Sequence, residues 1–394
     1  MVAHPSETPL TSSRPPLILV PGSLHSRLLL ASAPTSRCAA NPPGTVAYVN
    51  WSAWRSAPAQ ECWIAQLALV IDEHDRFVSP AGVNVSVACG ADSDCFGATA
   101  ALPACDPWTC PQPSTYGTFV SALLDAGYRA GSDLFVAAYD WRHAPGRELD
   151  PFCRALARLV ERAAAHAPAV IAGHSAGPAL IGHCLRAQSA PWRRRFVRGM
   201  LSLNGLVGGE IDCLETLWRG GDFRNAAERV TSWDAHAYRA TQWSWGVTAW
   251  CLPQPGLYGR RPLVSVGSRD YSAEALPALF DLVGATPLGR TWPLVVNATP
   301  PEAAPGVRTV WCVYGVGVPT PVHYRFADGN LSTPPEVTMG DGDGQQPTES
   351  NAACARWRAP GAEVLLQAFP RADHDSILSD ERVLRYVLDT VLAP

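Results

Sequence analysis

Short apolar runs alternate along this chain with longer segments in which apolar positions recur every three or four residues. Such runs are typical of buried parallel strands, and the recurring positions are typical of amphipathic helices. We therefore expect an α/β fold, with a mostly parallel central sheet covered on both faces by helices. The pattern predicts strands at 16–20, 135–142, 168–172, 200–205, 307–316 and 363–369, and helices at 151–167, 176–188 and 376–392.

The segment VIAGHSAGPAL at 170–180 places a serine between a predicted strand and a predicted helix. Ser175 lies two residues from Gly173 and two from Gly177, as in the Gly-x-Ser-x-Gly turn called a nucleophile elbow. That turn needs glycine because the chain passes too close to itself for a Cβ atom. The context predicts that Ser175 is a catalytic nucleophile, and a purely structural turn is the alternative.

A serine nucleophile needs a histidine base, and the base needs a carboxylate that orients it. In the elbow fold the carboxylate and then the histidine follow the serine along the chain. His374 fits this order because it stands between the strand predicted at 363–369 and the last predicted helix. The Gly-rich stretch MGDGDGQQPTES, at 339–350, offers Asp341 and Asp343 as the carboxylate.

The negative charge that develops on the substrate must be stabilised by two backbone N–H groups. We expect one from Ala176, which follows the nucleophile, and one from Ser23, in the loop after the strand at 16–20. The sequence contains no metal-ligand spacing such as His-Glu-x-x-His or paired Cys-x-x-Cys, and we expect no metal and no cofactor.

Three segments interrupt the alternation of strands and helices. Residues 31–63 contain Cys38, Cys62, Trp51 and Trp54, and residues 86–113 contain four cysteines that suggest a disulfide-tied loop. Residues 210–260 form a predicted cap with five tryptophans. Because Trp favours the boundary between lipid and water, we expect the cap to face lipid or substrate, with ordinary core packing as the alternative.

Composition and charge narrow the class of protein. The 394 residues are 47% apolar and carry a net charge of −4, and no long basic run suggests a nucleic-acid partner. No run of about 18 apolar residues predicts a transmembrane helix. We expect a flexible tail at 1–16, which is polar and unlike a signal peptide, and one domain at 17–394.

Cysteines and glycosylation sequons point to the secretory pathway. The chain has 12 cysteines, and four of its eight asparagines, Asn50, Asn84, Asn297 and Asn330, lie in Asn-x-Ser/Thr sequons. We expect a secreted or lumenal protein. A cytosolic protein with coincidental sequons is the alternative.

Several motifs together resemble the lecithin:cholesterol acyltransferase family, which includes lysosomal phospholipase A and the phospholipid:diacylglycerol acyltransferases. They are ILVPGSLHSRL at 18–28, CWI at 62–64, AAYDWRHAPG at 137–146, GHSAG at 173–177, VYGVGVPTP at 313–321 and GDGDG at 340–344. The resemblance covers nearly the whole chain and implies an α/β-hydrolase fold with Ser175, Asp343 and His374 as the triad. It selects Asp343 over Asp341.

The same resemblance implies further features. A Cys38–Cys62 disulfide would close a lid loop at 38–62 whose Trp51 and Trp54 face lipid, and a second disulfide would join Cys312 to Cys354. The expected activity is transfer of a fatty acyl group from a glycerophospholipid, through an acyl-serine, to a sterol or another lipid alcohol. The expected partners are a membrane or lipoprotein surface and an activating, apolipoprotein-like protein. A phospholipase that uses water and a catalytically dead lipid-binding protein are the alternatives.

Overall fold

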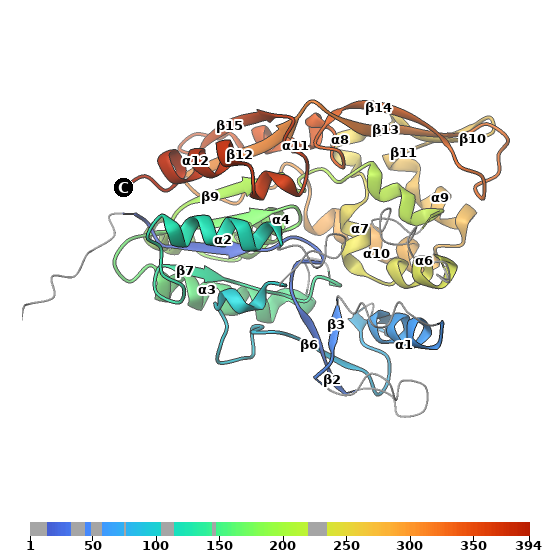
Figure 1. Cartoon of the computed structure of the whole chain (residues 1–394). Helices are drawn as coiled ribbons and strands as arrows, with labels where there is room; N and C mark the ends of the chain where they lie inside the picture. The colour runs from blue at the N-terminus through green and yellow to red at the C-terminus, as the bar shows by residue number, and fades with distance from the viewer. Residues whose placement is uncertain are drawn as a thin grey trace, which may run out of the picture.

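A six-stranded parallel sheet forms the centre of the fold (Figure 1). The computed structural model describes residues 14–32, 44–48, 57–74, 76–103, 114–143, 147–219 and 235–394. Its central strands have the order β15-β12-β9-β8-β1-β7, and each neighbouring pair is parallel. Their bounds are β1 (Leu17–Val20), β7 (Leu134–Val136), β8 (Ala169–His174), β9 (Val197–Leu203), β12 (Thr309–Val316) and β15 (Glu363–Pro370). This sheet confirms the predicted α/β fold class with a mostly parallel central sheet.

Helices cover both faces of the central sheet because its strands are apolar on both sides. Ile18 and Ile171 pack with helices α3 (Asp150–Ala163) and α4 (Gly177–Arg186). Their sequence neighbours Leu17 and Val170 pack on the opposite face. That face is covered by α2 (Thr115–Asp125) and α12 (Glu381–Tyr386), and α5 (Ala190–Phe196) precedes β9.

A second, four-stranded sheet, which the sequence analysis did not predict, lies beside the central one (Figure 1). Its order is β11-β10-β13-β14, and β13 carries Pro319 and Pro321, residues that argue against a strand. The chain leaves β12 through β13 and returns along β14 to Asp343, so this sheet positions the predicted carboxylate. Its strands are β10 (Pro262–Val266), β11 (Arg269–Ser272), β13 (Val318–Phe326) and β14 (Glu336–Gly342).

Five helices pack under this second sheet, namely α6 (Ala235–Trp243), α7 (Gly246–Cys251), α8 (Pro255–Tyr258), α9 (Leu276–Val283) and α10 (Thr286–Ala298). The predicted orientation of the cap tryptophans is wrong where the structure describes them. Trp218, Trp243, Trp245 and Trp250 are all buried in the hydrophobic core. The indole N–H groups of Trp243 and Trp245 donate to the backbone carbonyls of Thr216 and Leu67, respectively. The Trp218 ring packs edge-on against Tyr324.

A further group of elements lies between β1 and α2 in the sequence. They are β2 (Leu28–Ser32), β3 (Val46–Tyr48) and β6 (Asn84–Val87) in one antiparallel sheet, β4 (Val70–Ile71) with β5 (Phe77–Val78), and helix α1 (Ala57–Leu67). A Cys89–Cys95 disulfide ties the start of the predicted Cys-rich loop. Among the described residues, no helix has both the length and the apolar character required to cross a membrane.

Three segments differ in the structure from what the sequence predicts. The strand expected at 135–142 stops at Val136. The helix expected at 376–392 is divided, because the Asp380 side chain accepts a hydrogen bond from the Arg382 amide and starts α12 afresh. The tail expected at 1–16 is described from Arg14 onward, where Arg14 donates to the Leu388 carbonyl.

Candidate active site

Ser175 stands on a sharp turn between β8 and α4. Its φ is +54°, a left-handed conformation that costs a residue with a side chain of order 1–3 kcal/mol. The turn is held on both sides of the residue: the Ser175 amide donates to the Leu203 carbonyl at 3.1 Å, and the Ser175 carbonyl accepts from the Leu206 amide at 2.7 Å. The strain is therefore maintained by the neighbouring strand.

The two glycines of the turn are required by close approach of the backbone. A Cβ on Gly173 would lie 2.5 Å from the Pro178 nitrogen, and one on Gly177 would lie 2.4 Å from the Val20 carbonyl oxygen. Real Cβ atoms essentially never come this close to another atom. The structure thus has the elbow geometry that the Gly-x-Ser-x-Gly pattern predicts.

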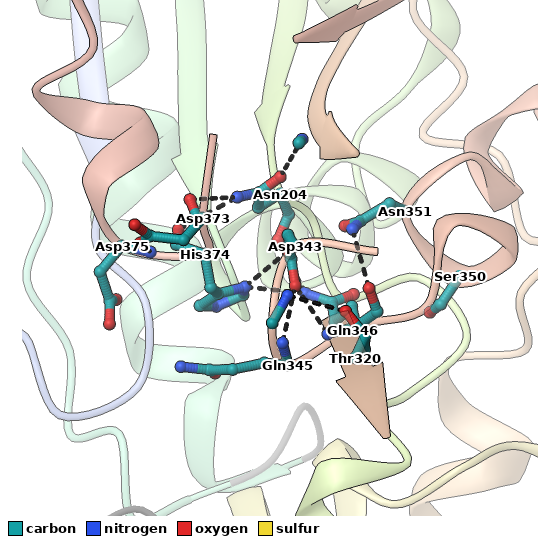
Figure 2. A network of polar contacts seen from close by, with 12 residues as sticks. Asn204, Thr320, Asp343, Gln345, Gln346, Ser350, Asn351, Asp373, His374 and Asp375 are labelled. Atoms are coloured by element: carbon teal, nitrogen blue, oxygen red, sulfur yellow. Dashed lines mark hydrogen bonds and ion pairs between the residues drawn. The ribbon is translucent and has the colours of Figure 1, made fainter. Parts of the chain in front are cut away.

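Asp343 and His374 form a buried pair next to this turn (Figure 2). His374 donates from Nδ1 to Asp343 Oδ2 at 3.0 Å, and its backbone amide donates to the Asp343 carbonyl at 2.8 Å. The other carboxylate oxygen accepts from the amides of Gln345 and Gln346. Both carboxylate oxygens are engaged, which fixes the imidazole with Nε2 available to accept a proton.

The charge of the pair follows from its surroundings. Burial disfavours the charged imidazole, but the adjacent Asp343 carboxylate and its hydrogen bond outweigh it and raise the pKa of His374. Glu210 and Asp375 act in the same direction at longer range. The pair therefore favours protonated His374, the form that exists after the histidine takes a proton from serine.

One cavity of about 270 Å³ contains the predicted residues. Ser175, Asp343, His374 and Ser23 all line it, and so do two buried carboxylates from the segment after β9, Glu210 and Asp212. A Cβ on Gly22 would lie 2.8 Å from the Ser175 Cβ, so the loop that carries Ser23 runs directly against the serine. Ala176, the other predicted oxyanion residue, is fully buried immediately before α4.

A chain of hydrogen bonds that the sequence analysis missed connects this loop to His374. The Gly22 amide donates to the Tyr116 hydroxyl at 2.8 Å, and that hydroxyl contacts His174 Nδ1 at 3.1 Å. His174 Nε2 donates to the His374 carbonyl at 2.7 Å. Burial, together with His374 and His25, lowers the pKa of His174, so the ring is neutral and can accept from Tyr116 while it donates to His374.

Asn204, at the end of β9, is a second residue that the sequence analysis did not identify (Figure 2). Its amide nitrogen donates to the carbonyls of Asp373 and His374, and its amide oxygen accepts from the Gly315 amide. Gln346 in turn donates to the Asn204 carbonyl at 2.9 Å. Asn204 thereby ties the ends of β9 and β12 to the segment that carries the histidine.

The YDWR motif at 139–142 has an architectural role. Arg142 is buried and pairs with Asp140 at 2.6 Å, and a second hydrogen bond joins Arg142 Nε to the same carboxylate. Burial raises the pKa of Asp140, but Arg142 outweighs burial and holds it at about 2. Asp373 caps the turn after His374 by accepting from the Ser376 amide, whereas Asp375 makes no such side-chain cap.

Disulfides connect elements around the site. Cys312 in β12 is joined to Cys354, the pair that the resemblance implies, and Cys153 in α3 is joined to Cys184 in α4, a pair that the sequence analysis left open. Cys62 is disulfide-bonded, but Cys38, its predicted partner, lies outside the described residues. Trp51 and Trp54 also lie outside them.

The chain resembles known structures and proteins along most of its length. A putative aryl esterase from Burkholderia cenocepacia covers 96% of this chain and 90% of its own, at 14% identity and a TM-score of 0.35. A lysosomal phospholipase A and acyltransferase from Bos taurus is 28% identical over 97% of this chain and 93% of its own length. A phosphatidylcholine-sterol acyltransferase from Mus musculus is 27% identical over 97% and 87%.

A plant protein and a family model also match the sequence of this chain. A lecithin-cholesterol acyltransferase-like protein from Oryza sativa is 30% identical over 95% of this chain and 86% of its own length. The family profile of lecithin:cholesterol acyltransferase matches residues 47–255 and 288–382, which is well over half of the sequence. The chain therefore belongs to the lecithin:cholesterol acyltransferase family.

Proposed function

We propose that this protein moves a fatty acyl group from a glycerophospholipid to a sterol or another lipid alcohol, through an acyl-serine at Ser175. The observation that carries the proposal is the strained serine turn beside the buried Asp343–His374 pair, with all three side chains lining one cavity. Membership of the family supports a lipid ester as the acyl donor.

In the first step Ser175 Oγ attacks the ester carbonyl carbon, and His374 Nε2 takes the hydroxyl proton. The carbonyl π bond opens to an oxyanion, which the amides of Ser23 and Ala176 stabilise. The C–O bond to the lysophospholipid then breaks, and its oxygen receives the proton from His374. Asp343 keeps the imidazole in the required tautomer and stabilises its charged form.

In the second step an acceptor alcohol repeats this chemistry in reverse. Its oxygen attacks the acyl-serine carbonyl while His374 takes its proton, and the proton returns to Ser175 Oγ when the ester leaves. Water can replace the alcohol without any change of catalytic residue, so hydrolysis is the runner-up function. The bovine relative is named both as a phospholipase A and as an acyltransferase, which supports keeping both outcomes.

The proposed setting is the surface of a lipid aggregate in a secretory or lysosome-like lumen, with an apolipoprotein-like activator as a candidate partner. The three sequon asparagines in the described part, Asn84, Asn297 and Asn330, are exposed and open to glycosylation. Three disulfides join described cysteines, as is usual in oxidising compartments.

An active-site-directed fluorophosphonate probe tests the serine chemistry independently of the lipid. We expect stoichiometric labelling of the native protein, no labelling of Ser175→Ala, and labelled peptide containing Ser175 by mass spectrometry. Absence of labelling in the native protein would support the third candidate, a lipid-binding protein without catalysis, and would refute the proposed mechanism.

A further inference from the structure

A groove of about 310 Å³ lies at the amino ends of β9 and β12 and contains four arginines. They are Arg193 and Arg194 from α5, Arg198 from β9, and Arg308 just before β12. The other residues that line the groove are uncharged, so no lining residue is acidic. Four cations therefore share one hollow in a chain whose net charge is −4.

The groove is separate from the candidate active site. β9 carries Arg198 near its start and Leu203 at its end, where the Leu203 carbonyl accepts from Ser175. Five residues of extended chain span about 17 Å. A ligand in the groove would consequently lie at the end of the sheet opposite the serine and would not contact the reacting ester.

One arginine forms a rigid wall of the groove. Arg193 donates from Nε to the Gly306 carbonyl at 2.8 Å and from Nη1 to the carbonyls of Leu185 and Gln188. Gly306 has a φ of +73°, and a Cβ there would come to 3.0 Å from the Arg193 guanidinium. Three carbonyls hold this guanidinium in place, so one face of the groove is positively charged before any ligand arrives.

The side chains of the other three arginines do not hold elements of the fold together. Within the described part of the chain, no hydrogen bond or ion pair involves the guanidinium groups of Arg194, Arg198 or Arg308. Glu363 is near, since its amide donates to the Arg308 carbonyl, but its carboxylate forms no ion pair with Arg308. Like charges that line one groove with no acidic residue among them repel one another, and a bound anion relieves that repulsion.

We propose that this groove is a binding site for a phosphate group, distinct from the reaction cavity. Guanidinium forks match the oxygens of phosphate in charge and geometry, and several of them around one group give selective binding. The phosphate can belong to a soluble phosphate ester or to an anionic lipid headgroup. This inference does not depend on the proposed acyl transfer.

Titration calorimetry on the full-length protein tests the site with inorganic phosphate and glycerol 3-phosphate, with chloride at equal ionic strength as the salt control. Parallel flotation assays use phosphatidylcholine vesicles with and without phosphatidic acid. The test variant is Arg194→Gln with Arg198→Gln. Arg195→Gln is the matched control, because Arg195 is in the same helix, stacks over Phe196 and does not line the groove.

We expect saturable binding that the double variant weakens at least about tenfold and that the Arg195→Gln control leaves unchanged. Binding of the soluble phosphates identifies a soluble ligand, and binding only to vesicles with phosphatidic acid identifies a lipid headgroup. Both outcomes support the site. The proposal is overturned if neither ligand binds saturably, or if the control variant loses as much affinity as the double variant. Circular dichroism and thermal unfolding of each variant report that the protein remains folded.

Discussion

At the scale of single residues, the candidate site depends on polar contacts between positions far apart in the chain. Ser175, Asp343 and His374 stand at places that sequence patterns mark: a Gly-x-Ser-x-Gly turn, a Gly-rich turn and a strand end. Tyr116 and His174 could not be predicted as parts of this site, because their roles arise from contacts with residues up to 200 positions away. A local pattern carries no information about such partners.

The raised pKa of His374 leads to a prediction about pH. The base must be neutral to accept the serine proton, so kcat/KM should rise as the pH increases through the pKa of His374. In Asp343→Asn that pKa falls, and the acidic limb of the profile should move to lower pH. The maximal rate should fall by roughly 10³–10⁴, because the tautomer is no longer fixed.

Asp341→Asn is the matched control for this experiment. Asp341 is exposed and accepts from the Gly317 amide and the Thr348 hydroxyl, and it does not contact His374. Its pH profile should match that of the native protein. The assignment of Asp343 fails if the Asp341 variant loses activity while the Asp343 variant retains it.

At the scale of elements, the central strands were predictable and the second sheet was not. Strands buried on both faces leave continuous apolar runs in the sequence, as in β8 and β12. β14 is mostly exposed and β13 contains two prolines, so neither has that pattern. The elbow also depends on the packing of whole elements, because its two glycines lie against the backbone of β1 and of α4.

Gly177→Ala tests the elbow directly. The added methyl group would lie 2.4 Å from the Val20 carbonyl oxygen, so β1 or α4 must shift. We expect the free energy of unfolding to fall by about 3 kcal/mol or more, together with loss of fluorophosphonate labelling. Gly289→Ala is the control, since a Cβ there meets nothing within 4 Å and alanine favours the helix. Equal stability of the two variants would contradict the close-packed turn.

The Cys153–Cys184 disulfide joins the two helices on one face of the sheet. It closes a segment of 31 residues, whereas Cys89–Cys95 closes one of 6. Replacing the first pair by alanine should lower the free energy of unfolding by about 3–4 kcal/mol and the second by about 2 kcal/mol, because longer loops lose more entropy on cross-linking. Denaturant unfolding of the two double variants measures this order. A larger loss for the Cys89–Cys95 pair would show that chain entropy is not the main contribution.

At the scale of the whole molecule, segments from four parts of the chain meet at one cavity. The loop after β1 supplies Ser23, and the turn after β8 supplies Ser175. The segments that follow β14 and β15 supply Asp343 and His374, respectively. In open parallel sheets, ligand sites form at the carboxyl ends of the strands, which is where these segments lie. The four cap tryptophans that the structure describes, Trp218, Trp243, Trp245 and Trp250, contribute to the core and do not line this cavity.

The most direct test of acyl transfer uses vesicles of phosphatidylcholine and sterol with a labelled acyl chain, incubated with the native protein and with Ser175→Ala. Steryl ester, free fatty acid and lysophospholipid are then separated. We predict lysophospholipid and steryl ester from the native protein and neither from the variant. Free fatty acid without steryl ester would contradict transfer to sterol and favour hydrolysis, and acyl products formed equally by Ser175→Ala would contradict the acyl-serine mechanism.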